Sequence, residues 1–70
     1  MSKVREYRLK ARLSQSQLAT KAKVDDRTVR RAEEDQPIQD VKAAAIADAL
    51  SEALQMTLTI DDLEIVIYSP

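Results

Sequence analysis

The most constraining feature of this chain is a series of helix start and stop signals, set so closely that only short helices fit between them. Ser14 followed three residues later by Gln17 is a capping box, which predicts a helix that starts at about residue 15. Asp25 is a favourable N-cap for another helix. Pro37 ends that helix, because the residue before a proline is pushed out of the helical conformation. The sequence therefore predicts two short helices joined by a tight link.

Apolar spacing extends this prediction to four helices. Apolar residues recur at helical intervals over 3–11, and the two capped segments are predicted as helices over 15–22 and 26–33. An alanine-rich stretch from 38 or 39 to 54 has high helix propensity throughout. We expect a small, mainly α-helical bundle of four helices, or five if the C-terminal segment adds one.

Residues 55–70 change in character. Segment 57–60 alternates polar and apolar side chains, and segment 63–68 is β-branched and aromatic, so the pattern predicts a strand or a hairpin. Thr59 followed three residues later by Asp62 is also a capping pattern, so a short fifth helix is the alternative at this point. We favour the strand for 63–68.

This predicted strand leads to a division of the chain and to a predicted dimer. We divide the chain into a helical domain, 1–54, and a C-terminal β extension, 55–70. A chain of 70 residues has little core to cover a strand that is apolar on both faces, so pairing with a second copy would cover it. The predicted dimerisation residues are Leu63, Ile65, Val66, Ile67 and Tyr68.

Charge is distributed unevenly along the chain, although the net charge is only -1. Residues 1–31 hold ten basic and three acidic side chains, a net charge of +7, whereas residues 32–70 hold one basic and nine acidic side chains, a net charge of −8. Such asymmetry suggests a basic face for a polyanion and an acidic remainder that faces solvent.

Several residue types are missing, and their absence excludes classes of function. The chain has no Cys, His or Gly, so it lacks the usual general base, the commonest metal ligands and any glycine-rich phosphate loop. We expect no enzyme, no catalytic residue, no metal and no cofactor. No apolar run approaches the roughly 18 residues of a membrane helix, so we expect a cytoplasmic protein without a membrane partner.

Three blocks of residues carry a family resemblance. They are 13–19 (LSQSQLA), Val24 and 28–33 (TVRRAE), and the spacing between them matches the pattern of the Cro/repressor-type (XRE-like) helix-turn-helix domains. The resemblance runs from about residue 4 to residue 50, and it implies a double-stranded DNA partner.

The resemblance also implies roles for individual residues. At positions where the family touches bases or adjacent phosphates stand Asp26, Arg27, Thr28 and Arg31. We assign contacts with the DNA backbone to Gln15, Lys10, Lys23 and Arg30. Arg8 and Glu33 match positions that join the first and third helices in a partly buried ion pair, so these two are expected to stabilise the fold.

The chain departs from the family pattern at three positions. Lys23 and Arg12 stand where the family usually has Gly, and a left-handed backbone there costs about 1 kcal/mol. Asp26 brings a negative charge to the DNA-facing end of the third helix, where it would repel phosphates unless it accepts a hydrogen bond from a cytosine amine.

Two functional hypotheses follow. The first is a sequence-specific DNA-binding regulator, most simply a repressor that acts as a homodimer on a palindromic operator. The second is a helix-turn-helix scaffold used as a protein-interaction module, such as an antitoxin subunit or an adaptor. Salt-dependent binding to duplex DNA distinguishes them.

Overall fold

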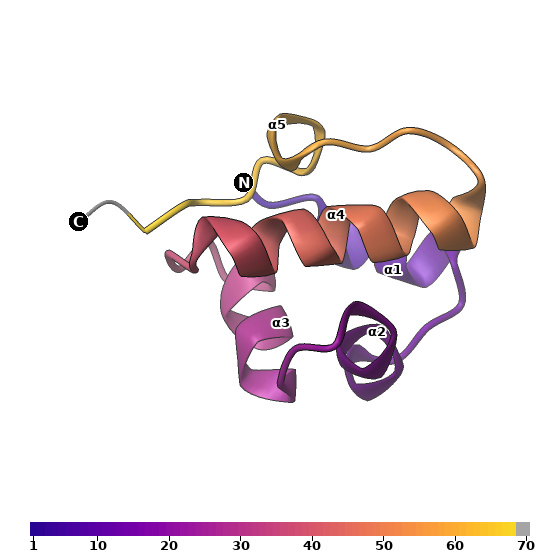
Figure 1. Ribbon diagram of the computed structural model, residues 1–70, viewed down its shortest axis with the longest axis horizontal. Helices are drawn as coiled ribbons and strands as arrows, with labels where there is room; N and C mark the ends of the chain where they lie inside the picture. Colours follow the sequence, from indigo (N-terminus) through magenta and orange to yellow (C-terminus); the bar gives the residue numbers. More distant parts are fainter. Residues whose placement is uncertain (69–70) are drawn as a thin grey trace.

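Five helices make up most of residues 1–68, which are the residues that the computed structural model describes. Their bounds, followed along the chain in Figure 1, are α1 Val4–Lys10, α2 Gln15–Ala22, α3 Asp26–Glu33, α4 Asp40–Leu54 and α5 Ile60–Leu63. The mainly α-helical fold is confirmed, and the predicted bounds of α2 and α3 match the observed ones. Within the described part, no helix is long and apolar enough to cross a membrane.

The longest helix, α4, lies at the centre of the arrangement. In Figure 1, α5 lies on one side of α4, while α2 and α3 lie on the other. The helices α1, α2 and α3 all contact α4, and α2 also packs on α3. Alanines at positions 43, 47 and 49 of α4 are buried, so neighbouring helices approach its backbone closely.

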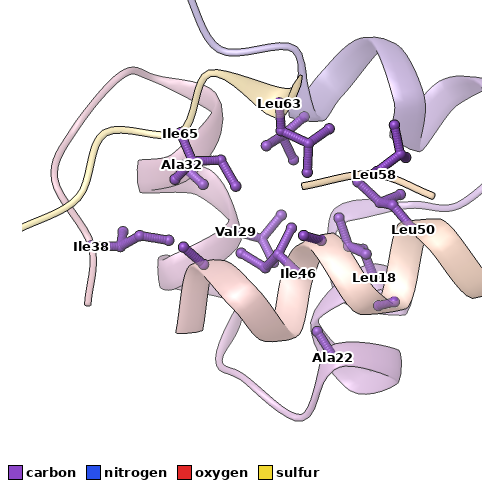
Figure 2. Close-up of a cluster of buried hydrophobic side chains, with 14 of the residues drawn as sticks. Leu18, Ala22, Val29, Ala32, Ile38, Ile46, Leu50, Leu58, Leu63 and Ile65 are labelled. Carbon is purple, nitrogen blue, oxygen red and sulfur yellow. The ribbon is translucent and has the colours of Figure 1, made fainter. Parts of the chain in front are cut away.

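The core is built from every helix and from the segment that follows α4. Figure 2 shows Leu63 and Ile65 reaching from the C-terminal segment into the same cluster as the helix side chains. The largest fully buried side chains are Leu18, Ile46, Leu50, Leu63, Val4 and Val29. Residues 55–68 therefore pack on the same core as the helices that precede them.

The predicted strand over 63–68 was wrong, and the alternative of a short fifth helix is what the structure contains. The Thr59 hydroxyl accepts a hydrogen bond from the Asp62 N–H at 3.0 Å, and the Asp62 carboxylate accepts one from the Thr59 N–H at 3.0 Å. This capping box starts α5, and the helix continues to Leu63. The capping box makes 60–63 helical because it satisfies two backbone donors, and the β-branched residues that follow find only one isolated bridge, at Ile67.

After the left-handed Glu64, residues 65–68 form no strand of a sheet. A single parallel bridge joins Ile67 to Ile38, in the loop before α4. The Ile38 N–H donates to the Val66 carbonyl oxygen at 3.1 Å, and the Tyr68 N–H donates to the Ile38 carbonyl oxygen at 2.7 Å. Nearer the N-terminus, the Lys3 N–H donates to the Leu63 carbonyl oxygen at 2.8 Å. The C-terminal segment is thus tied to two distant parts of the chain.

Each of the five helices ends in the same way, although the chain has no glycine. A residue with φ between 52° and 60° follows each helix: Arg12, Lys23, Asp35, Gln55 and Glu64. The next N–H in each case donates to the carbonyl oxygen five residues earlier, over 2.9 to 3.3 Å, which is the hydrogen bond of a Schellman cap. The left-handed conformations expected at Lys23 and Arg12 are therefore present, and three more positions share them.

Candidate nucleic-acid interface

The helices α2 and α3 form a helix-turn-helix. The Ser14 hydroxyl accepts from the Gln17 N–H at 3.0 Å, and the Gln17 side chain accepts from the Ser14 N–H at 2.8 Å, so α2 starts at the predicted capping box. Lys23 turns the chain after α2, and Val24 packs against the core. A tight turn that is fixed by a cap and by an apolar contact sets α3 against α2.

One face of α3 is buried and the other is open to solvent. Val29 and Ala32 are fully buried, as their spacing predicts. Asp26, Arg27 and Arg30 are exposed. A helix of eight residues with two exposed arginines on its outer face is suited to contact a polyanion.

Two of the four predicted base-contacting residues, Asp26 and Arg27, lie in the exposed first turn of α3. The other two are differently placed. Thr28 is only 6% exposed, and Arg31 is half-buried, with its Nη2 donating to the Pro37 carbonyl oxygen at 3.2 Å. The structure therefore groups Asp26 and Arg27 on one surface and holds the other two closer to the protein.

Thr28 has a partner within the protein. Its hydroxyl donates to the carboxylate of Asp25, the N-cap residue of α3, and this hydrogen bond holds the pKa of Asp25 below its usual value. Asp25 occupies the predicted N-cap position, yet its side chain accepts from this hydroxyl and not from a backbone N–H. The pair fixes the first turn of α3.

Asp26 also has a partner, one that the sequence did not reveal. The Ser16 hydroxyl, in the first turn of α2, donates to Asp26 Oδ2 at 2.7 Å. This bond joins the starts of the two helices on the exposed side of the motif. The two residues are ten positions apart, and no spacing rule predicts their contact before the angle between α2 and α3 is known.

A comparison with protein-family models supports what this geometry indicates. Residues 4–60 match the family model described as Helix-turn-helix, which is most of the chain. The chain belongs to the Cro/repressor-type (XRE-like) helix-turn-helix family. This is a family of DNA-binding transcription regulators. The searches of curated proteins and of solved structures gave no match.

In this helix-turn-helix protein, the residues assigned to the DNA backbone lie in different surroundings. Lys23 and Arg30 are exposed, in the turn and on the outer face of α3. Lys10 ends α1, where its Nζ lies 3.8 Å from Glu6 Oε2 and 5.0 Å from the centre of the Tyr7 ring. Gln15 begins α2. The structure therefore places Lys23, Arg30 and Gln15 in the helix-turn-helix motif, whereas Lys10 belongs to α1.

The predicted ion pair between α1 and α3 is present and is the most buried ion pair among the described residues. Arg8 Nε donates to Glu33 Oε2 at 2.6 Å, and the two side chains are 11% and 7% exposed. Arg8 Nη1 also donates to the Leu13 carbonyl oxygen at 2.9 Å. Gln15 Nε2 donates to Glu33 Oε1 at 3.2 Å, so the residue assigned to the DNA backbone also supports this pair.

The predicted dimerisation residues divide into two groups. Leu63 and Ile65 are 0% and 7% exposed and belong to the core, so the expectation that the monomer's own helices would leave them uncovered was wrong. Val66 and Tyr68 are 38% and 60% exposed, and Ile67 is half-buried. Within the described residues, only this second group has a surface that a partner can reach.

Proposed function

We propose that this helix-turn-helix protein is a sequence-specific transcriptional repressor, which inserts α3 into the major groove of its operator. The observation that carries this proposal is the outer face of α3. Arg27 and Arg30 are exposed there, and neither side chain has a hydrogen bond or ion pair within residues 1–68. Arginine is the commonest residue to contact guanine, through two parallel hydrogen bonds to O6 and N7.

The position of the basic residues supports the same proposal. Ten of the eleven lysines and arginines precede Ala32, so they belong to α1, α2, α3 and their turns. Most of the acidic residues belong to α4 and the segments around it. Because duplex DNA is negatively charged, such a protein is attracted to it in the orientation that turns the helix-turn-helix toward the DNA.

Asp26 has a defined role in this proposal. The Ser16 hydroxyl occupies Oδ2, which leaves Oδ1 to accept a hydrogen bond from the N4 amine of a cytosine. A carboxylate held in this way repels a phosphate or a base edge that offers only acceptors. Asp26 therefore contributes to the choice of sequence, and Ser16 orients it.

The test starts from a selection of bound sites out of random duplex DNA. On the selected sequence, Arg27→Ala is expected to cost about 1–3 kcal/mol and to relax the preference at one base pair. Arg5→Ala removes the same charge from an exposed site on α1 and serves as the control. If Arg27→Ala changes neither the preferred sequence nor the affinity for the selected duplex, α3 does not contact bases.

A second comparison separates base contacts from backbone contacts. Gln15→Ala is expected to weaken binding to all duplexes by a similar factor, because a contact with phosphate carries no sequence information. The melting temperature of this variant is measured in parallel, since Gln15 also donates to Glu33. Loss of preference at a single base pair in Gln15→Ala would contradict the assignment.

We further propose that the repressor acts as a homodimer on a palindromic operator. One α3 contacts only a few base pairs, and paired half-sites about 34 Å apart give a dimer its specificity. Truncating residues 63–70 is unsuitable as a test, because it removes Leu63 and Ile65 from the core. The better variant is Val66→Lys, which changes an exposed residue of the C-terminal segment.

Sedimentation equilibrium of the wild-type chain and of Val66→Lys decides the question of the dimer. We expect the wild type to form a dimer and Val66→Lys to shift toward monomer with an unchanged helical spectrum. A dimer that is as tight in the variant would place the interface on the helices. An absence of salt-dependent binding to any duplex would favour the alternative of a protein-interaction module.

A further inference from the structure

A hollow of about 280 Å³ lies beside α3, between that helix, the loop before α4 and the C-terminal segment. Arg27 and Arg31 line it from α3, and Lys42 lines it from the first turn of α4. Tyr68 lines it from the C-terminal segment, which passes the start of α4 in Figure 1. The bridge between Ile38 and Ile67 holds Tyr68 in this position.

The charges around the hollow favour an anion with two negative charges. Among residues 1–68, three cationic side chains and a single carboxylate, that of Asp25, line it, and together they carry a net charge of +2. The carboxylate is engaged by the Thr28 hydroxyl, and the charge of Lys42 also lowers the pKa of Asp25. A phosphate monoester carries close to two negative charges near neutral pH.

Arg31 supplies a second indication. Its Nη2 donates to the Pro37 carbonyl oxygen, but its Nε is buried and has no hydrogen-bond partner within the described residues. A buried donor without an acceptor is unfavourable, and guanidinium groups bind phosphate through pairs of parallel hydrogen bonds. A phosphate that drew this guanidinium toward the hollow would give it the acceptors that the protein does not supply.

We propose that the hollow binds a small molecule that carries a phosphate monoester, and that this ligand competes with operator DNA. The volume is at the lower limit of small-molecule sites, which fits a phosphate with a small organic group lying against the Tyr68 ring. Competition follows because Arg27 lines the hollow and also belongs to the face of α3 that the proposed function assigns to DNA. The competition rests on that proposed function, whereas the binding of phosphate does not.

Binding is tested on the whole chain without DNA. Inorganic phosphate and phenyl phosphate are titrated at constant ionic strength, and the NMR signals of the arginine Nε–H groups are followed. The Arg31 signal is expected to move with a saturable curve, and phenyl phosphate is expected to bind more tightly because its ring lies against Tyr68. Arg31→Ala is expected to weaken binding about tenfold or more.

Arg30→Ala is the matched control, because it removes the same charge from the same helix without altering the lining of the hollow. Equal affinities in the two variants would show that phosphate is attracted only by overall charge, and would overturn the site. The small-molecule site would also be overturned if neither probe bound and Arg31→Ala weakened binding to all duplexes equally. In that case the hollow would hold a phosphate of the DNA backbone.

A displacement experiment with duplex DNA distinguishes the phosphate site from the proposed DNA-binding function. Phenyl phosphate is expected to displace the selected duplex from the wild type, and to do so more weakly from Arg31→Ala. If no duplex binds but the probes still require Arg31, the proposed function fails and the phosphate site stands. If the probes bind without displacing the duplex, the competition is refuted.

Discussion

Replacing Glu33 with alanine is expected to be the most destabilising single change in the polar part of the helix-turn-helix motif. The variant leaves the Arg8 guanidinium, which is 11% exposed, without its carboxylate. Removing one partner of a buried ion pair costs about 3–5 kcal/mol. Arg8 keeps its bond to the Leu13 carbonyl oxygen, while Gln15 loses its acceptor, so we expect about 3 kcal/mol, at the lower end of that range.

The loss is large compared with the whole stability of a domain of this size, which is about 4–10 kcal/mol. Urea denaturation followed by circular dichroism measures it, and the melting temperature should fall by about 10–20 °C. Glu34→Ala is the control, because this neighbouring glutamate is exposed and its change should cost less than about 0.5 kcal/mol.

A double replacement tests whether the loss of stability comes from burying an unpaired charge or from losing the geometry of the ion pair. Arg8→Met combined with Glu33→Leu removes both charges and fills the site with apolar groups, so it should recover most of the lost stability. Equal unfolding midpoints for Glu33→Ala and Glu34→Ala would refute the reasoning. A double variant that is as unstable as the single one would show that the pair contributes through its geometry and not through the burial of an unpaired charge.

Three further outcomes are expected. Lys23→Gly should stabilise the protein by up to about 0.5 kcal/mol in urea denaturation, because the left-handed strain of about 1 kcal/mol slightly exceeds the entropy that glycine adds. In an NMR titration the pKa of Asp25 should lie below 3.8 and return toward that value in Thr28→Val. A folded pKa that is lowered means that the contribution of Asp25 to stability is complete above the unfolded pKa and is lost as the pH falls through the folded one. Leu63→Ala should cost about 2–5 kcal/mol in urea denaturation, far more than Val66→Ala, because Leu63 is fully buried in the core.

The parts of the fold that local signals determine were predictable from the sequence. The Ser14 capping box satisfies backbone donors within a few residues and identified where α2 begins, and Asp25, at the N-cap position, identified where α3 begins. The spacing of Val29 and Ala32 identified the buried face of α3. The ion pair of Arg8 with Glu33, in contrast, came from a family resemblance, since nothing local joins residues that are 25 positions apart.

What the sequence could not predict depends on contacts between distant segments. Three β-branched residues after Glu64 favoured a strand, but within the described residues their only β-bridge is the one between Ile67 and Ile38. The bond from Ser16 to Asp26 depends on the angle between two helices. The approach of Tyr68 to Arg31 around the hollow depends on the path of the whole C-terminal segment.

The ties of the C-terminal segment determine the order in which this fold can form. The five helix caps close over six residues each, so each cap depends only on residues near it in the sequence. The bond from Lys3 to Leu63 spans 60 positions, and Leu63 itself fills the centre of the core. Contacts that distant form late, because they close long loops. We therefore expect that, during synthesis, the core that holds α2 and α3 closes only when residues 58–65 have left the ribosome.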